Sequence, residues 1–259
     1  MSGEEDAPVS WLSSWIRHII AAAVIIPGAV LLIIAALPLL PLRRLRVRLG
    51  NLYGYTIGPI VTAIAGIQLE CEGLQHTRVD QPTLFVMNHT SNADPWVAMQ
   101  VVPSPTASIA KKEIFRVPFF GQAYFLAGHL LLDRKDRNKA IRSVDSLAAT
   151  MKRLRLSMLV WPEGTMPKDG RLLPFRPGFV HMAIAVGCPV VPIVAQGAHI
   201  RWEPRSMTLR PGVLKLQVLP PIDTTGWTPE RASEHASDIR QRFLEVLSPD
   251  QQPLGGDDD

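Results

Sequence analysis

Residues 83–95 read TLFVMNHTSNADP and combine a short apolar run with the start of a helix. The run at 83–87 is bounded by polar residues, which is typical of a buried strand. Ser91 and Asn92 are residue types that cap helices, and the Asp-Pro pair that comes after them suits a first helical turn. The stretch therefore predicts a strand-to-helix turn of the kind from which α/β sheets are built.

His89 stands on this predicted turn, five residues before Asp94. That spacing is too wide for one face of a continuous helix, but a bend between the two residues lets the carboxylate reach one ring nitrogen. The other nitrogen is then held as a neutral acceptor, which is the form that a general base requires. A capping or surface pair would have the same sequence, so the choice between the two interpretations depends on motifs farther along the chain.

Short apolar runs alternate with helix-like stretches from about residue 68 onward. The predicted strands are 68–72, 83–87, 107–110, 128–132, 157–161, 190–197 and 215–219. The predicted helices are 95–101, 121–127, 139–152, 180–185 and 229–247. This alternation predicts an α/β fold with a mixed, largely parallel β-sheet flanked by helices.

Three parts of the chain differ in character. Residues 1–66 are predicted to be N-terminal membrane-anchoring helices, and residues 67–247 to be the α/β domain. Residues 248–259 are rich in Pro, Gly and Asp, which predicts a disordered acidic tail.

No charged residue occurs from Ile19 to Leu42, a run long enough to cross a hydrocarbon core of about 30 Å. The run is too long for a cleavable signal peptide, and no small-residue cleavage site clearly comes after it. Trp11 and Trp15 precede the run, as interfacial anchors would, and arginines at 43, 44, 46 and 48 come directly after it. By the positive-inside rule, the arginines predict membrane association with the active site at the cytoplasmic face.

Two membrane geometries fit this segment. One is a single tilted span, and the other is a helix pair dipped into one leaflet. Prolines at 38 and 41 would end the first helix near Leu37, and a second apolar stretch covers residues 57–67. Because arginines between the two stretches can bind anionic headgroups, we favour the in-leaflet pair.

The chain of 259 residues has 27 Lys and Arg against 23 Asp and Glu, a formal net charge of +4. Acidic residues gather at both ends, so the interior is more basic than this total. A basic interior suits phosphate-bearing substrates or an anionic membrane surface. It is not dense enough in Lys and Arg, and it lacks the motifs, for nucleic-acid binding.

Four ordered segments carry a resemblance to a known family. They are residues 88–94 (NHTSNAD), 111–121 with 128–134 (KKEIFRVPFFG and GHLLLDR), 161–165 with 170–178 (WPEGT and GRLLPFRPG), and 190–194 (VVPIV). Together they resemble the glycerolipid acyltransferases, the family that includes the 1-acylglycerol-3-phosphate acyltransferases, over roughly residues 83–195.

The resemblance implies an O-acyltransferase that joins a fatty acyl group to the free hydroxyl of 1-acylglycerol 3-phosphate. The acyl group would arrive as a thioester of coenzyme A or acyl carrier protein, and no further cofactor is expected. His89 would take the hydroxyl proton, and Asp94 would hold the ring and stabilise the imidazolium. No covalent intermediate is required, which agrees with the lack of a Gly-x-Ser-x-Gly elbow in the sequence.

The substrate-binding residues that the resemblance implies fall into two sets. The basic set would bind phosphate and consists of Lys112, Arg134 and Arg176. The second set would form the acceptor loop, where the carboxylate orients a basic partner or the headgroup, and consists of Glu163, Gly164 and Thr165. Nothing in either set suggests a metal site.

Met166 stands where the family usually has a basic residue, which puts the acceptor in doubt. Lys168 or Arg171 could substitute, or the acceptor could be glycerol 3-phosphate, another lysophospholipid or a glycolipid. From another class, the chain could be a lipid ester or thioester hydrolase with Ser91 as nucleophile, although Ser91 fits a helix cap better. An inert membrane adaptor is a third reading, which the intact His89 and Asp94 disfavour.

Large apolar side chains gather between residues 115 and 126. Such a stretch is more often plain core, and its second interpretation is the wall of an acyl tunnel or a membrane-facing lip. The side chains are Phe115, Val117, Phe119, Phe120, Phe125 and Leu126.

Overall fold

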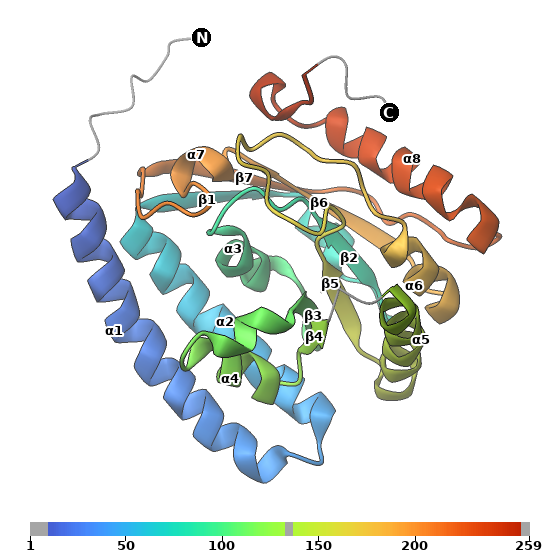
Figure 1. The fold of residues 1–259 in the computed structure, drawn as a ribbon, viewed down its shortest axis with the longest axis horizontal. Helices are drawn as coiled ribbons and strands as arrows, with labels where there is room; N and C mark the ends of the chain where they lie inside the picture. The colour runs from blue at the N-terminus through green and yellow to red at the C-terminus, as the bar shows by residue number, and fades with distance from the viewer. Residues whose placement is uncertain (1–9, 133–136, 255–259) are drawn as a thin grey trace.

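The computed structural model describes residues 10–132 and 137–254, and its centre is a seven-stranded sheet (Figure 1). The strands are β1 (Ile67–Glu72), β2 (Leu84–Met87), β3 (Thr106–Lys111), β4 (Leu130–Leu132), β5 (Ser157–Val160), β6 (Val190–Gln196) and β7 (Gly212–Val218). Their order is β1-β7-β6-β2-β5-β3-β4, and every neighbouring pair is parallel except β6 with β7. The predicted mixed, largely parallel sheet is confirmed.

The central strands are buried on both faces, as expected for parallel strands covered by helices. All of β2 is buried, and β6 is buried up to its last residue. Strand β7, which lies next to the edge strand β1, alternates between buried and more exposed positions, which indicates one covered face. The strand that leads into the His89 turn, β2, is thus buried along its whole length.

The predicted helices are present within a few residues, and the short helix at Ala198–Arg201 is an addition to them. The helices are α1 (Trp11–Ala36), α2 (Arg43–Ala65), α3 (Asp94–Val101), α4 (Phe120–Leu126), α5 (Arg137–Leu154), α6 (Gly178–Val186), α7 (Ala198–Arg201) and α8 (Ala232–Leu244). Short 3-10 turns η1 (Leu37–Leu39), η2 (Leu74–Thr77), η3 (Lys112–Arg116), η4 (Pro229–Arg231) and η5 (Pro249–Gln251) connect them.

The helices cover the sheet in two layers, which Figure 1 shows on either side of the strands. One layer holds α5, α6 and α8, whose apolar side chains, such as Met151, Phe179 and Phe243, join one core cluster. The other layer holds α2, α3 and α7, and its cluster includes Val97 and Phe85. Helices therefore cover both faces of the sheet, so a functional site can form only at the ends of the strands.

The first two helices form a hairpin that folds back against the body (Figure 1). Three glycines at four-residue spacing lie where α2 meets the body. A Cβ on Gly50 would stand 2.7 Å from Ala127 Cβ, one on Gly54 2.8 Å from Met99 Cβ, and one on Gly58 2.8 Å from the Trp96 carbonyl oxygen. Since real side chains do not approach so closely, the glycines allow α2 to pack directly on α3 and α4.

Three of the four arginines that come after the apolar run contact protein backbone. Arg43 donates to the Gly128 carbonyl at 3.0 and 3.1 Å, Arg46 to Leu126 at 2.8 Å, and Arg44 to Leu154 at 2.9 Å. These carbonyls lie at the ends of α4 and α5, where helix carbonyls lack helical partners. These contacts dock α2 on the body, and contacts of the arginines with lipid headgroups remain a prediction.

The segment 248–254, predicted to be part of a disordered tail, is ordered. Gln251 is fully buried, accepts the Gly197 N–H at 3.0 Å and donates to the Ala195 carbonyl at 3.3 Å. Its own carbonyl accepts the Leu172 N–H at 2.8 Å. Polar composition alone suggested disorder, whereas one buried amide holds the segment; residues 255–259 lie outside the described residues.

One helical segment of the described chain, Trp11–Leu39, is long and apolar enough to cross a membrane by length and composition. The predicted end of the first helix near Leu37 agrees with α1 and η1. The division of the chain into parts at residues 66 and 247 remains a prediction. Helix α2, which precedes the first boundary, packs against the part of the chain that contains the sheet.

Candidate active site

The candidate site lies where parallel strands β2, β5 and β3 end side by side. His89 comes after β2, Glu163 after β5, and Lys112 after β3. Because the carboxyl ends of parallel strands meet at one edge of a sheet, residues distant in sequence converge there. The topology places the three predicted motifs along the same edge.

His89 and Asp94 are in direct contact across the turn. The His89 Nδ1 atom lies 2.9 Å from Asp94 Oδ2, and the same oxygen accepts the backbone N–H groups of Thr90 at 2.7 Å and Ser91 at 2.8 Å. The Asp94 side chain is completely buried, whereas the His89 side chain is 20% exposed. The bend that the sequence predicts is present, and it brings the carboxylate to the ring.

This contact fixes what the imidazole can do. A carboxylate at Nδ1 favours the tautomer with the proton on Nδ1, so Nε2 is left as a neutral acceptor. The second carboxylate oxygen, Asp94 Oδ1, is buried and has no hydrogen-bond partner among the described residues. The pair is therefore arranged as an oriented base with a buried anion behind it.

Glu163 joins this turn to the loop after β5. Its Oε1 accepts the His89 backbone N–H at 2.7 Å, and its Oε2 accepts the Leu173 N–H at 3.1 Å. The side chain is only 2% exposed, and this burial raises the pKa of Glu163 to about 8, against the lowering effect of the two backbone donors. Both oxygens face backbone groups, whereas we expected a basic partner or a substrate headgroup.

The indole of Trp161 covers the His89 ring. The two ring centroids are 4.9 Å apart, with an angle of 31° between the planes. The Trp161 Nε1 atom is buried and has no hydrogen-bond partner among the described residues. Trp161 is not among the site residues predicted from the sequence, although an aromatic residue directly before Pro-Glu-Gly-Thr was a visible signal.

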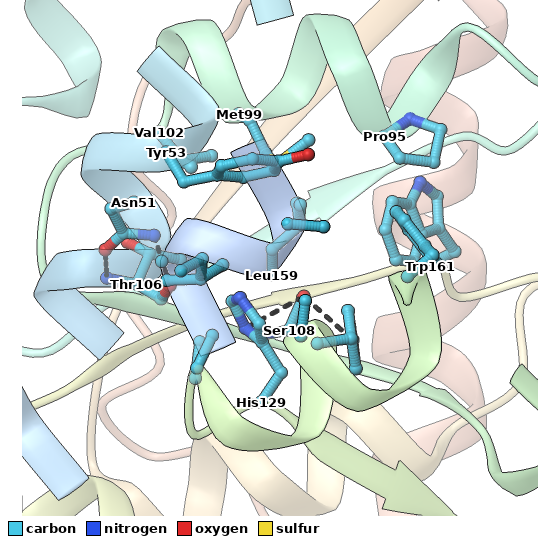
Figure 2. Close-up of a pocket in the computed structure, with 18 residues that line it drawn as sticks. Asn51, Tyr53, Pro95, Met99, Val102, Thr106, Ser108, His129, Leu159 and Trp161 are labelled. Carbon is cyan, nitrogen blue, oxygen red and sulfur yellow. Dashed lines mark hydrogen bonds between the residues drawn. The ribbon is translucent and has the colours of Figure 1, made fainter. Parts of the chain in front are cut away.

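An apolar cavity, partly open to solvent, lies beside Trp161 (Figure 2). Trp161 and Pro95 line the end nearest the His89 turn, and Leu32, Met99 and Ala123 are among its apolar lining residues. The lining comes from α1, α2, α3, α4, β3 and the end of β5. A mostly apolar cavity that begins at the indole over His89 can hold a hydrocarbon chain.

The cavity lining contains no Asp, Glu, Lys or Arg, and three of its polar residues, Ser108, Tyr124 and His129, are hydrogen-bonded together. Ser108 donates its backbone N–H to His129 Nδ1 at 3.0 Å, and its hydroxyl lies 2.9 Å from the Tyr124 hydroxyl (Figure 2). Burial lowers the pKa of His129 to about 4 and raises the pKa of Tyr124, so both are neutral at pH 7. A neutral interior of this kind suits an uncharged chain.

The aromatic stretch between 115 and 126 is not plain core, so that expectation was wrong. Phe120 lines the cavity, and the other aromatic and branched side chains are mostly turned outward. The exposed ones are Phe115, Val117, Phe119 and Phe125. The position of Phe120 fits the tunnel-wall interpretation, and the membrane-facing lip remains a prediction for the exposed side chains on η3 and α4.

The structure describes two of the three predicted phosphate-binding residues. Lys112 is exposed at the start of η3, and Arg176 is exposed in the loop after β5, where its backbone N–H donates to the Pro162 carbonyl at 3.0 Å. Arg134 lies outside the described residues. Gly164 has a φ of +76°, and with Thr165 it completes the turn next to Glu163. Lys112 and Arg176 thus lie at the same edge of the sheet as His89.

Ser91 is held as a structural residue. Its hydroxyl donates to the Trp202 carbonyl at 2.7 Å and accepts the Ala93 N–H at 3.0 Å, and the residue is completely buried. A hydroxyl with both roles occupied cannot serve as the nucleophile of a hydrolase in this arrangement. Within the described residues, no group of three or more His, Cys, Asp or Glu could hold a metal ion.

The comparisons with known proteins point to one family. The profile of the acyltransferase family matches residues 68–196. A 1-acyl-sn-glycerol-3-phosphate acyltransferase of Limnanthes douglasii is 35% identical over 97% of this chain and 89% of its own length. The enzyme of that name from Escherichia coli K12 is 31% identical, covering 73% of this chain and 76% of its own length.

A human relative agrees with this grouping, and a solved structure has the same fold. The 1-acyl-sn-glycerol-3-phosphate acyltransferase alpha of Homo sapiens is 34% identical over 70% of this chain and 64% of its own length. The crystal structure of the 1-acyl-sn-glycerophosphate acyltransferase from Thermotoga maritima superposes with a TM-score of 0.71 at 20% identity, covering 91% of this chain and 96% of that one. This likeness confirms the fold.

Proposed function

This chain belongs to the 1-acyl-sn-glycerol-3-phosphate acyltransferase family, and we propose that it acylates the free hydroxyl of 1-acylglycerol 3-phosphate to give phosphatidate. The donor in this proposal is a long-chain thioester of coenzyme A or acyl carrier protein. The observation that carries the proposal is the oriented His89–Asp94 pair beside an apolar cavity, with Trp161 common to both.

The proposed reaction needs one base and no covalent enzyme intermediate. His89 Nε2 takes the proton of the hydroxyl as its oxygen attacks the thioester carbonyl carbon. The tetrahedral intermediate then collapses, the carbon–sulfur bond breaks, and the imidazolium returns the proton to the departing thiolate. The products are an ester and a free thiol, and His89 is neutral again. Asp94, buried at Nδ1, stabilises the imidazolium while the proton is held.

The surface around the cavity supports membrane association. Exposed large apolar side chains occur along α1 and η3–α4, next to the cavity lining. On α1 they are Trp11, Leu12, Trp15, Ile16, Ile19, Ile20, Ile26, Leu31 and Ile34. An apolar surface of this length at the mouth of an apolar cavity would let a lipid acceptor reach the site from the bilayer.

The contacts of α1 favour the in-leaflet helix pair over a single span. Arg17 donates to the Ala65 carbonyl at 2.9 Å, and the Ser14 hydroxyl accepts the Leu209 N–H at 3.2 Å. Farther along, Ala29 and Leu32 pack against α4. A helix that lies along the body over this length is placed to enter one leaflet together with α2, with the active site at the cytoplasmic face.

Cysteine labelling separates the two geometries. In proteoliposomes, S10C at the start of α1 and K168C in the exposed loop near the site should react with an impermeant maleimide from the same side. The unsubstituted chain, which has Cys71 and Cys188, gives the background. Labelling of the two positions from opposite sides would instead establish a span.

Activity is tested with purified protein, oleoyl-coenzyme A and 1-oleoylglycerol 3-phosphate by following free thiol. H89A should reduce turnover by about 10²–10⁴-fold, the usual contribution of a general base. H181A is the matched control, because His181 is an exposed histidine on α6, in the opposite layer of helices. Turnover by H89A close to that of H181A would reject the assigned role of His89.

The acceptor is tested separately because Met166 stands in the place of the usual basic residue. Lysophosphatidate should be acylated faster than glycerol 3-phosphate, a lysophospholipid with a larger headgroup, or a glycolipid, all compared with one donor. Lysophosphatidate is then assayed with the acyl group on coenzyme A and with the acyl group on acyl carrier protein. The two rates show which carrier is preferred. A faster reaction with one of the other acceptors would replace phosphatidate as the product and keep the chemistry.

A further inference from the structure

The ring of His89 has different neighbours in its plane and on its face. In the plane, the Asp94 carboxylate contacts Nδ1 at 2.9 Å. On one face, Trp161 lies with its centroid 4.9 Å away. The other titratable groups nearby are Glu163, which accepts the His89 backbone N–H, and His199, whose pKa is lowered by burial against a raising effect of the Asp94 charge. Trp161 is thus the aromatic group in direct contact with the ring that gains charge.

We propose that Trp161 is a positioning residue for acyl transfer, and that its indole face stabilises the positive charge that His89 acquires when it takes the hydroxyl proton. This inference rests on the proposed general-base role of His89. The face of an indole carries negative electrostatic potential, and a cation within about 6 Å of the ring centroid is attracted to it. The distance between the two centroids in the structure satisfies this condition.

The contribution of Trp161 differs from that of Asp94. Asp94 is fixed by two backbone N–H groups and acts through a hydrogen bond to one nitrogen, so it sets the tautomer. The indole acts on the whole ring and attracts the protonated form more strongly than the neutral form. Because it also lines the apolar cavity, the indole would separate the forming charge from the hydrocarbon chain of the donor.

The unpartnered indole N–H makes the proposal testable by conservative substitution. Trp161 Nε1 has no hydrogen-bond partner in the described part of the chain, so W161F removes a ring of stronger potential without removing a hydrogen bond. W161L removes the aromatic face altogether. Fluorinated tryptophans placed at 161 by codon suppression keep the shape of the side chain and progressively withdraw electron density from its face.

The readout is the acidic limb of the pH profile of kcat/KM, which reports the pKa of His89 in the free enzyme. If the indole stabilises the imidazolium, this apparent pKa should fall in the order Trp161, W161F, W161L, by about half a unit to one unit in total. Increasing fluorination should lower it stepwise. A merely structural role predicts the opposite sign, because opening the site to water favours the charged form of histidine and raises its pKa.

Trp227 supplies the matched control. It stacks on His235 with centroids 4.4 Å apart and an angle of 9°, beneath α8 and away from the site. Fluorinated tryptophan at 227 should leave the profile unchanged. An apparent pKa that stays constant or rises across the fluorinated series at 161 would overturn the proposal. The H89A result is independent, so loss of the general-base assignment and loss of the Trp161 assignment are distinguishable.

Discussion

The Glu163 carboxyl group accepts the backbone N–H of His89 at 2.7 Å, so the two motifs are joined without use of the imidazole. Its second oxygen accepts the Leu173 N–H at 3.1 Å. Glu163 therefore connects the turn after β2, at His89, with a later part of its own loop, at Leu173. By residue type Glu163 could be an acidic catalyst, but in this structure its side chain holds the backbone of His89, the proposed base.

E163Q should lower kcat more than it changes KM. An amide has one oxygen, so it can accept only one of the two N–H groups and presents its own N–H₂ to the other. The His89 backbone would then shift. A buried N–H left without its acceptor costs about 1–3 kcal/mol, which predicts a loss in kcat of roughly tenfold to a hundredfold. Thiol-release kinetics measure both constants. E245Q, at an exposed position after α8, is the control.

The stability of the protein should depend on pH through the same residue. Burial raises the pKa of Glu163 to about 8 from its ordinary 4.5, so the folded state retains a proton that the unfolded state releases. The stabilisation is full below about pH 4.5 and is lost as the pH rises toward 8. Thermal unfolding between pH 5 and 8.5 should show a shallower decline for E163Q than for the unchanged chain, and parallel curves would contradict this.

The parts of the fold and site that the sequence predicts are those set by neighbouring residues. The strands and most helices can be predicted from local apolar patterns, and the His89–Asp94 contact forms within one turn of five residues. The convergence of His89 with Glu163 can also be predicted, because parallel strands end at one edge. Each of these depends on periodicity or topology, which a single sequence contains.

The features that were missed are contacts between segments far apart in the chain. Trp161 lies over a ring 72 positions earlier, and Gln251 reaches Gly197 across 54 positions. The backbone partners of Arg43, Arg44 and Arg46 also lie far along the chain, so the sequence alone does not reveal that these arginines dock α2. The spacing of Gly50, Gly54 and Gly58, by contrast, is a signal of close helix packing that can be read in the sequence.

Q251A should destabilise the protein by about 1–3 kcal/mol, the usual cost of leaving a buried N–H without its acceptor. The group left unpaired is the Gly197 N–H, at the end of β6. Thermal unfolding should therefore show a Tm lower by several degrees. Q241A, at an exposed position on α8, should leave the Tm nearly unchanged. Equal Tm values for the two variants would show that the ordered segment is not held by this amide.

A123F should shift the acyl preference toward shorter chains. Ala123 is 4% exposed and lines the apolar cavity, so a phenyl group there would occupy part of the space available to a hydrocarbon chain. Competition between acyl-coenzyme A substrates of graded length, with product masses as the readout, measures the preference. A63F places the same side chain at an exposed position of α2 and should leave the preference unchanged. If A123F lowered turnover equally for all lengths, this cavity would not be the acyl site, because filling it must penalise long chains most.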